Sequence, residues 1–523
     1  SVERKFVLRA GERRELTYEL KRRTPLRMEG WYTGDNHDHM VHGERMVTVD
    51  FAYAALAARS EGLDYLSLAH LWNLPQATPE DLDRECRNAS TDDFLLTWNL
   101  EAPKNYYRGD VSKCLGHGWT AGMRGRTEDG RDAIGELLAL SAHDYESDKD
   151  PAANFESHAL IHSLGGVVSY SHPCRWWWGK WGGRGIYPVE EKKFVSNMAA
   201  ELPFDTVAGP TYDTIDVLMQ PHETAANDCA QQLWFLLLNK GYRIAASGST
   251  DATFDRPGGG VPGRVRMYTR VRGGFSLAAV AEALKTGRSL VTSGPLVMLE
   301  MNGYGSGDVV GIPTCGGGPC LVSIKGRIRA WASGAATSGL RKVELIRNGV
   351  VVKTFEPVSG RTEIESGFNV VERERAWYIA RCFGADAGHI AITNPVYFEP
   401  EGSRPPEPVP ARITAVVKDG ITGGPLRGRW EVIRMVGKEA IAETAADFVD
   451  GSFRLEARAT ARIRVTVPGY EPLTKSIFLD SPALLESTFR LRTEDLTDWR
   501  TFERMRELLQ DVRLEFAVKK LTR

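Results

Sequence analysis

The chain has 523 residues, of which 42% are hydrophobic and 26% are charged. These proportions are ordinary for a globular protein, and the length predicts about two to four domains. A net charge of −2 offers no basic surface for nucleic acid. No apolar run approaches the roughly 20 residues that span a bilayer. The composition therefore argues against a nucleic-acid partner and against a membrane span.

The sequence starts at Ser1 without a signal peptide, as both a processed export precursor and a shortened chain would. Seven is an odd number of cysteines, so at least one is unpaired within the chain. Cys315 and Cys320 flank a Gly-Gly-Gly-Pro segment and either close a small disulfide loop or remain two thiols. A disulfide would indicate an oxidising compartment. We expect an exported protein, periplasmic or secreted, rather than a cytoplasmic one, and oligomerisation stays open.

The first half of the chain alternates strand-like and helix-like segments. Residues 1–27 predict an N-terminal strand segment, and residues 28–295 predict an α/β domain with parallel strands. In such domains the loops after the strands converge to form the site. The strand-like runs are 63–68, 94–100, 166–170, 215–219 and 243–246, and the helical stretches are 49–60, 132–141 and 230–239.

The pattern changes after Gly294 and Pro295, where predicted strands follow one another without helices. Asn348 and Gly349 stand between two of these strands and favour a two-residue hairpin turn. The expected order is a β-sandwich at 296–400, a Pro-rich linker at 401–410, a second small β domain at 411–492 and a C-terminal helix at 493–523.

The strongest chemical signal is the pair His37 and His39, at the end of a short extended run. Alternate residues of a strand face the same side, so the two imidazoles can reach one cation. Neutral imidazole together with carboxylate is the usual ligand set for Zn, Mn or Fe. A His-x-His pair alone is a weak signal, and its weight depends on whether residues later in the chain add ligands of the same chemistry.

Polar residues of the same chemistry end later strand-like runs. Each is open to a structural explanation when taken alone. A histidine at a strand end often bonds a backbone carbonyl, and an aspartate after Gly-Ser-Thr often caps a helix. Their recurrence within one α/β segment favours a shared metal site. These residues are His70, Glu101, His117, His172 and Asp251.

In this order, the residues resemble the PHP (polymerase and histidinol phosphatase) metallohydrolase superfamily, and within it the CehA/McbA branch. The resemblance covers residues 28–400, while residues 411–492 are similar to carboxypeptidase-regulatory-like β modules. The phrases that carry it are GDNHDHM, GLDYLSLAHLWN, GGVVSYSHP, LWFLLLNKGYRIAASGSTDA and ALKTGRSLVTSGP.

The resemblance implies a distorted (β/α)7 barrel with metal ions at the carboxyl ends of its strands. It also implies a ligand set: His37, His39 and Asp251 for a first metal, Glu101 as a bridge, and His117 and His172 for a second metal.

Two positions depart from the family pattern. His70 occupies the histidine of the family's Thr-Asp-His motif, but Ala69 replaces the acid before it. Thr253 replaces the histidine that usually comes after the last aspartate. Both changes remove ligands, so we expect one or two divalent ions (Zn, Mn or Fe) rather than three.

Catalysis would then depend on a few further side chains. Glu101 would leave open positions for water and for a substrate oxygen. His70, or another histidine outside the ligand set, would protonate the leaving group. Asp35 lies two residues before His37 and would orient it, unless Asp35 is only a turn residue.

Substrate contacts are expected from the loop after His172. Trp176 and Trp177 would stack on a sugar or an aromatic substrate, or else pin the loop into a hydrophobic crevice. Arg266 would meet an anionic substrate or form a surface ion pair. Cys174, which lies beside this loop, is assigned no role.

The sequence thus predicts a metal-dependent hydrolase that cleaves an ester, amide, carbamate or phosphoester bond in a small-molecule or glycan-like substrate. Two alternatives remain. One is a catalytically degenerate PHP barrel that binds a carbohydrate or a surface. The other is a metal-dependent lyase that acts on a sugar.

Overall fold

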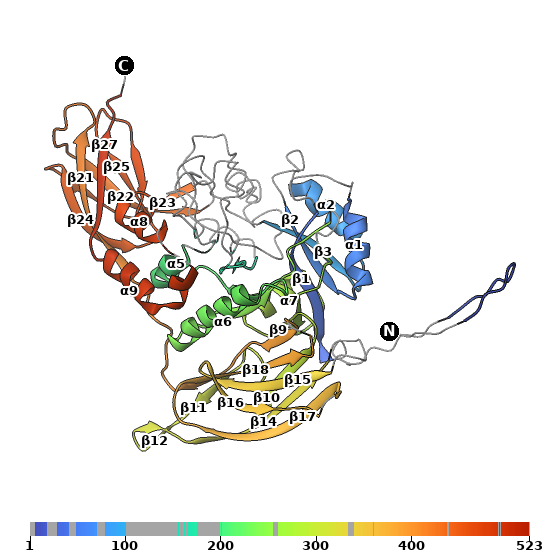
Figure 1. The fold of residues 1–523 in the computed structure, drawn as a ribbon. Helices are drawn as coiled ribbons and strands as arrows, with labels where there is room; N and C mark the ends of the chain where they lie inside the picture. Colours follow the sequence, from blue (N-terminus) through green and yellow to red (C-terminus); the bar gives the residue numbers. More distant parts are fainter. Residues whose placement is uncertain are drawn as a thin grey trace.

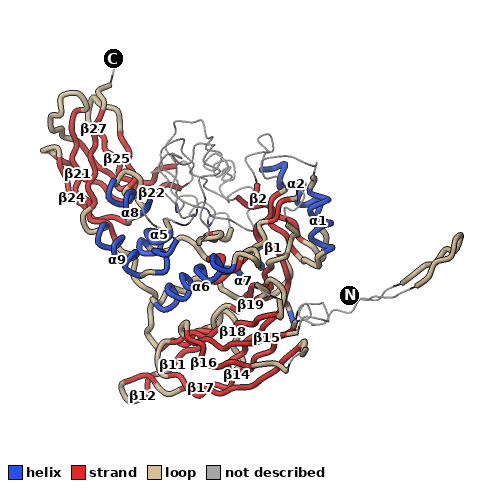
Figure 2. The backbone as a smooth tube through the Cα atoms, in the orientation of Figure 1, coloured by secondary structure: helices blue, strands red, loops and turns tan. Residues whose placement is uncertain are grey.

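The computed structural model describes residues 6–17, 29–40, 49–70, 79–100, 155, 158, 162, 166–174, 199, 201–254, 260–332, 339–358, 360–386, 388–436, 439–489, 491 and 493–521. Figure 1 shows an α/β part with helices α1, α2, α6 and α7, a β-sandwich next to it, and a second β module that contains the C-terminus. Figure 2 shows that strands make up most of the two β modules.

The α/β part begins with three parallel strands, as the sequence predicts. Helix α1 starts where the side chain of Asp50 accepts a hydrogen bond from the amide of Tyr53 at 2.7 Å, an ordinary N-cap. The elements are β1 (Trp31–His39), α1 (Phe51–Ser60), β2 (Tyr65–His70), α2 (Pro79–Ala89) and β3 (Leu95–Leu100).

A second group of parallel strands forms a separate three-stranded sheet, β4-β5-β6. Its central strand is buried along its whole length, as expected where helices and a second sheet cover both faces. The elements of this region are β4 (Ser169–Tyr170), α5 (Leu202–Ala208), β5 (Thr214–Leu218), α6 (Thr224–Asn239), β6 (Ala245–Gly248), β7 (Ala252–Thr253), β8 (Arg266–Arg270), α7 (Leu277–Lys285) and β9 (Ser289–Thr292).

The expected (β/α)7 barrel is wrong. Strand β1 pairs with parallel β2 on one side but with antiparallel β8 on the other. The sheet then continues through β9 into the strands of the sandwich, while β4, β5 and β6 stand apart from it. Strand–helix alternation favours parallel neighbours, but it does not specify which edge strands meet, because the ladder hydrogen bonds are made by the backbone alone.

Asn394 links the two sheets. Its buried side chain accepts a hydrogen bond from the amide of Ala246 at 2.6 Å and donates to the carbonyl of the same residue at 2.9 Å. The same side-chain amide donates to the carbonyl and the hydroxyl of Ser289 at the start of β9. The Asn394 side chain therefore pairs with the amide and the carbonyl of a residue in β6, as the backbone of a neighbouring strand would.

The predicted β-sandwich is confirmed. Side chains of β14 alternate between buried and exposed, so every second residue enters the core between the sheets. One layer contains β10 (Leu296–Met301), β14 (Val322–Trp331) and β17 (Glu363–Glu372). The other contains β11 (Val309–Ile312), β15 (Leu340–Arg347), β16 (Val350–Phe355), β18 (Ala376–Gly384), β19 (Ile390–Thr393) and β20 (Val396–Pro400).

One local prediction for the sandwich is also confirmed, and one question that the sequence left open is answered. Asn348 and Gly349 join β15 to β16, and both have the positive φ (49° and 84°) that a tight hairpin turn of this type requires. A disulfide joins Cys315 to Cys320 and closes the short hairpin of β12 (Thr314–Cys315) and β13 (Gly318–Pro319).

The C-terminal module consists of two facing sheets, β24-β21-β27 and β23-β22-β25-β26. The expected helix at 493–523 is wrong over its second half, where β27 pairs in parallel with β21. Residues 512–518 alternate buried and exposed, which is the period of a strand. The elements are β21 (Pro410–Asp419), β22 (Gly428–Val436), β23 (Glu439–Phe448), β24 (Ser452–Arg458), β25 (Arg462–Thr466), β26 (Leu473–Ser476), α8 (Pro482–Phe489), η4 (Thr493–Thr497), α9 (Trp499–Leu508) and β27 (Val512–Val518).

Two expectations concern the N-terminal segment and the membrane. The predicted strands are absent from residues 6–17, where Val7 and Leu8 are exposed. Among the helices in the described ranges, none is both long and apolar enough to cross a membrane.

Replacing Asn394 by leucine should destabilise the protein by about 2–4 kcal/mol. The change leaves the buried amide and carbonyl of Ala246 without their partners, at about 1–3 kcal/mol per group. Urea unfolding followed by circular dichroism measures the loss. Asn369→Leu, at an exposed position of β17, is the control and should change stability little. Equal effects of the two changes would contradict the linking role of Asn394.

Candidate metal centre

The two histidines of the His-x-His pair face one another at the end of β1. Both are fully buried, and their Nε2 atoms lie 3.0 Å apart. The β1–β2 register shifts between Asp35 and Asp38, just where the pair lies. Alternate residues of a strand face the same side, and His37 and His39 come together as the sequence predicts.

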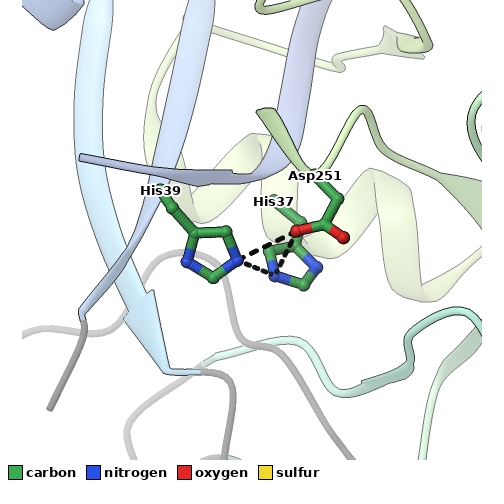
Figure 3. Close-up of side chains that lie close together, drawn as sticks. All are labelled: His37, His39 and Asp251. Atoms are coloured by element: carbon green, nitrogen blue, oxygen red, sulfur yellow. Dashed lines mark hydrogen bonds and ion pairs between the residues drawn. The ribbon is translucent and has the colours of Figure 1, made fainter. Parts of the chain in front are cut away.

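Asp251 reaches the histidines because its loop is bound to β1. The amide of Asp251 donates to the carbonyl of His37 at 2.8 Å, and the amide of Ala252 donates to Asp38 Oδ1 at 2.8 Å. The next residues form β7, which pairs in parallel with the end of β1. Figure 3 shows the Asp251 carboxylate pointing toward both imidazoles.

The geometry of these three side chains suits a single cation. Asp251 Oδ1 lies 3.0 Å from His39 Nε2 and 3.8 Å from His37 Nε2. The point equidistant from the three atoms is about 1.9 Å from each, close to the roughly 2.0–2.2 Å of zinc–nitrogen and zinc–oxygen bonds. The residues present therefore fit a metal ion.

Two buried carboxylates hold this arrangement in place. Asp35 accepts hydrogen bonds from the amides of Thr250 (3.1 Å) and Gly263 (2.7 Å), so it positions the Asp251 loop. Burial raises the pKa of Asp35, although these hydrogen bonds lower it in part. Burial also raises the pKa of Asp38 well above its ordinary value, and the negative charges of Asp35 and Asp251 raise it further. A cation bound nearby would favour the ionised forms of these carboxyl groups.

His172 lies next to His37, with their ring centroids 5.8 Å apart. Asp216 on β5 is also close, and its carboxylate accepts hydrogen bonds from Ser247 (2.6 Å) and Ser249 (2.9 Å). Burial raises the pKa of Asp216, while the two hydroxyls and the positive potential of His37 and His172 lower it. Asp216 was not among the predicted site residues, because its only signal in the sequence is an acid inside an apolar strand run.

Two of the site residues have strained backbones. Asp251 has φ 55° and His172 has φ 36°, in the left-handed region that side chains with a Cβ rarely adopt. The other non-glycine residues of this kind among those described are Asn302 and Asn348, and asparagine tolerates it in turns. Strain that persists at buried residues is typical of functional sites.

A disulfide that the sequence analysis did not expect supports His172. Cys174, two residues after His172, is bonded to Cys229 in helix α6, with Cα atoms 6.0 Å apart. Cysteine spacing alone did not reveal it, because connectivity among several cysteines cannot be read from the sequence. The bond anchors the end of the His172 loop to a helix.

Several predicted site residues lie outside the described residues. These are Glu101, His117, Trp176 and Trp177, together with the side chain of His70. Arg266 is described, and its guanidinium donates to the carbonyls of Gly263 (2.6 Å) and Glu61 (2.9 Å). Its described contacts are thus with the protein's own backbone.

The two departures from the family pattern flank His39. Ala69 in β2 and Thr253 in β7 are its register partners, and both are buried. Neither side chain offers an imidazole or a carboxylate. In the part of the chain that the structure describes, the group of metal-ligand side chains is His37, His39 and Asp251.

No family model and no curated protein matches the sequence. Among solved structures, the chain is similar to a CARDB domain from Pyrococcus furiosus (17% identity, 20% of this chain and 95% of that chain, TM-score 0.13). It is also similar to the major pilin subunit of Bacillus cereus (9% identity, 44% and 72%, TM-score 0.13) and to an adhesin from Mobiluncus mulieris (6% identity, 34% and 80%, TM-score 0.13). At such TM-scores these likenesses carry no argument about function.

Removing the disulfide at the site should lower the free energy of unfolding more than removing the disulfide in the sandwich. Loop-closure entropy predicts about 4 kcal/mol for Cys174→Ala/Cys229→Ala and about 2 kcal/mol for Cys315→Ala/Cys320→Ala, because the first bond closes a far longer loop. Guanidinium unfolding of the two double variants tests this order. If the sandwich variant is destabilised as much or more, the anchoring role of the first bond is refuted.

Proposed function

We propose that this protein is a metal-dependent hydrolase whose centre is formed by His37, His39 and Asp251. The observation that carries the proposal is that one ligand atom from each of three buried or half-buried side chains converges on a single point. The motif order that resembles PHP metallohydrolases supports the same chemistry. The proposal concerns the site and does not require a closed barrel.

Two histidines and one carboxylate are a ligand set of zinc hydrolases, in which three protein ligands leave a position for water. A divalent cation held there would lower the pKa of that water and polarise the bond under attack. The resemblance adds Glu101 and His117, which with His172 would hold a second ion. His70 remains our candidate for protonating the leaving group.

The remaining residues of the site position and shield this centre. Asp35 and Asp38 keep the Asp251 loop against β1 through backbone amides. The burial of both imidazoles limits access of bulk water and strengthens the electrostatic effect of any charge at the centre. The substrate class we propose is an ester, amide, carbamate or phosphoester of a small molecule or glycan, with Trp176 and Trp177 as its contacts.

We further propose that the protein works in an exported, oxidising compartment. Two disulfides support this proposal, since such bonds form and persist outside the reducing cytoplasm.

The purified protein should carry about one or two equivalents of Zn, Mn or Fe, measured by elemental analysis. His39→Ala and the near-isosteric Asp251→Asn should each remove most of this metal, because each deletes one of three converging ligands. His222→Ala, at an exposed histidine, is the control and should keep wild-type metal content. Metal retained in both site variants would refute the centre, and circular dichroism establishes that each variant is folded.

Activity should depend on the same residues. In a screen of chromogenic phosphoester, carboxylester and arylamide substrates, Asp251→Asn and Glu101→Gln should lower kcat by about a hundredfold or more, since both act on the metal-assisted step. Unchanged turnover in Glu101→Gln would remove its bridging role. An unsaturated product would indicate a lyase instead of a hydrolase.

A further inference from the structure

A charged cavity lies at the junction of the α/β part and the sandwich, away from the metal centre. Its volume is about 220 Å³, and strands β8, β9, β10 and β14 contribute its walls. Trp31, at the start of β1, lines it, whereas the histidines lie at the other end of the same strand. Six residues of extended chain separate Trp31 from His37, which is about 20 Å.

The walls of the cavity carry more positive than negative charge. Five arginines line it against three carboxylates, a surplus of two positive charges. Each carboxylate is already paired with an arginine. The pairs are Arg327 with Glu300 at 2.9 Å, Arg329 with Glu29 at 3.5 Å, and Arg272 with Asp308 at 3.4 Å.

The two remaining arginines stand directly opposite each other. The amide of Arg270 donates to the carbonyl of Arg288 at 2.7 Å, continuing the antiparallel β8–β9 ladder by one pair. Side chains in such a pair have Cβ atoms about 4.5–5.5 Å apart, and like charges there destabilise the sheet. Arg270 and Arg288 are therefore neighbours on one face of the sheet, where a counter-charge between them would be favourable.

Within the described ranges, the protein supplies little of that counter-charge. Arg270 makes no ion pair there, and the nearest acid to Arg288 is Glu282 at 3.8 Å, whose own side chain is 63% exposed. The Arg288 side chain is only 15% exposed, and its Nε atom is buried without a hydrogen-bond partner. A buried donor without a hydrogen-bond partner is unfavourable, and a bound acceptor would remove this cost.

The apolar surroundings strengthen the electrostatic attraction between the arginines and an anion. Trp31 and Leu290 belong to a small apolar cluster beneath the arginines. Water is partly excluded from such a floor, so the attraction between a guanidinium and an anion is stronger there than on an open surface. The carboxylate of Asp308 also accepts a hydrogen bond from the amide of Gly305 at 2.9 Å.

We propose that this cavity binds a small oxyanion, a phosphate, sulfate or carboxylate group, between Arg270 and Arg288. The planar guanidinium forks match the paired oxygens of such a group. The site is separate from the metal centre and does not depend on the hydrolase proposal.

Isothermal titration calorimetry of the full chain with inorganic phosphate, at constant ionic strength, tests the site. Arg270→Gln/Arg288→Gln should weaken binding by about tenfold or more, since charge-assisted hydrogen bonds are lost. Arg361→Gln, which removes an exposed arginine from the same sandwich, should leave binding unchanged. Binding that persists in the double variant, or is absent from the wild type, would overturn the proposal.

A second variant distinguishes phosphate binding in this cavity from phosphate binding at the proposed metal centre, which would also attract anions. In His39→Ala, phosphate binding to the cavity should persist with wild-type affinity. Its loss there would assign the binding to the metal centre and overturn the proposal. A parallel titration with a hexose 6-phosphate distinguishes the natural source of the group: tighter binding than phosphate indicates a sugar ester, and equal binding indicates the free anion.

Discussion

The arrangement of the candidate metal centre depends on where the buried backbone amides of one loop find hydrogen-bond acceptors. The amides of Thr250, Ala252 and Gly263 are buried donors, and the carboxylates of Asp35 and Asp38 accept them. Burying two carboxylates so close together costs free energy, because their charges lose water and repel each other. The amide hydrogen bonds offset part of this cost, and in the function we propose a cation offsets more. These acceptors act together with the bond from the Asp251 amide to the His37 carbonyl and with the β7–β1 pairing to hold the Asp251 loop along β1.

Strand β1 connects both of the proposed sites. At its carboxyl end it carries the two histidines, where parallel β2 and β7 lie on either side. At its amino end it pairs with antiparallel β8, and Trp31 there forms the floor of the arginine cavity. Because β8 and β9 continue into the sandwich, the two modules share one sheet. Asn394 links the separate β4-β5-β6 sheet to this shared sheet through hydrogen bonds to Ala246 and Ser289. The residues near His172 are therefore connected to the shared sheet as well.

Much of the local structure could be predicted from sequence because it depends on neighbouring residues. The Asn348–Gly349 turn follows from two residues that tolerate positive φ, whereas the sequence left open whether Cys315 and Cys320 form a disulfide. The pairing of His37 with His39 follows from the two-residue period of a strand. The prediction of a C-terminal helix was wrong over its second half, because apolar residues near 512 fit a helical stripe and a strand about equally well. Only pairing with β21 decides between them.

The amino-acid sequence by itself determined much of the order of strands and helices, the β-sandwich, and the residue types able to hold a metal. It did so because side-chain periodicity, turn residues and ligand chemistry act over a few positions. Only the tertiary structure decided that the parallel strands divide between two sheets, that Cys174 bonds Cys229, and that Asp216 lies beside the histidines. Each of these depends on contacts between distant segments, where backbone hydrogen bonds are alike for every sequence and packing selects among the possible partners.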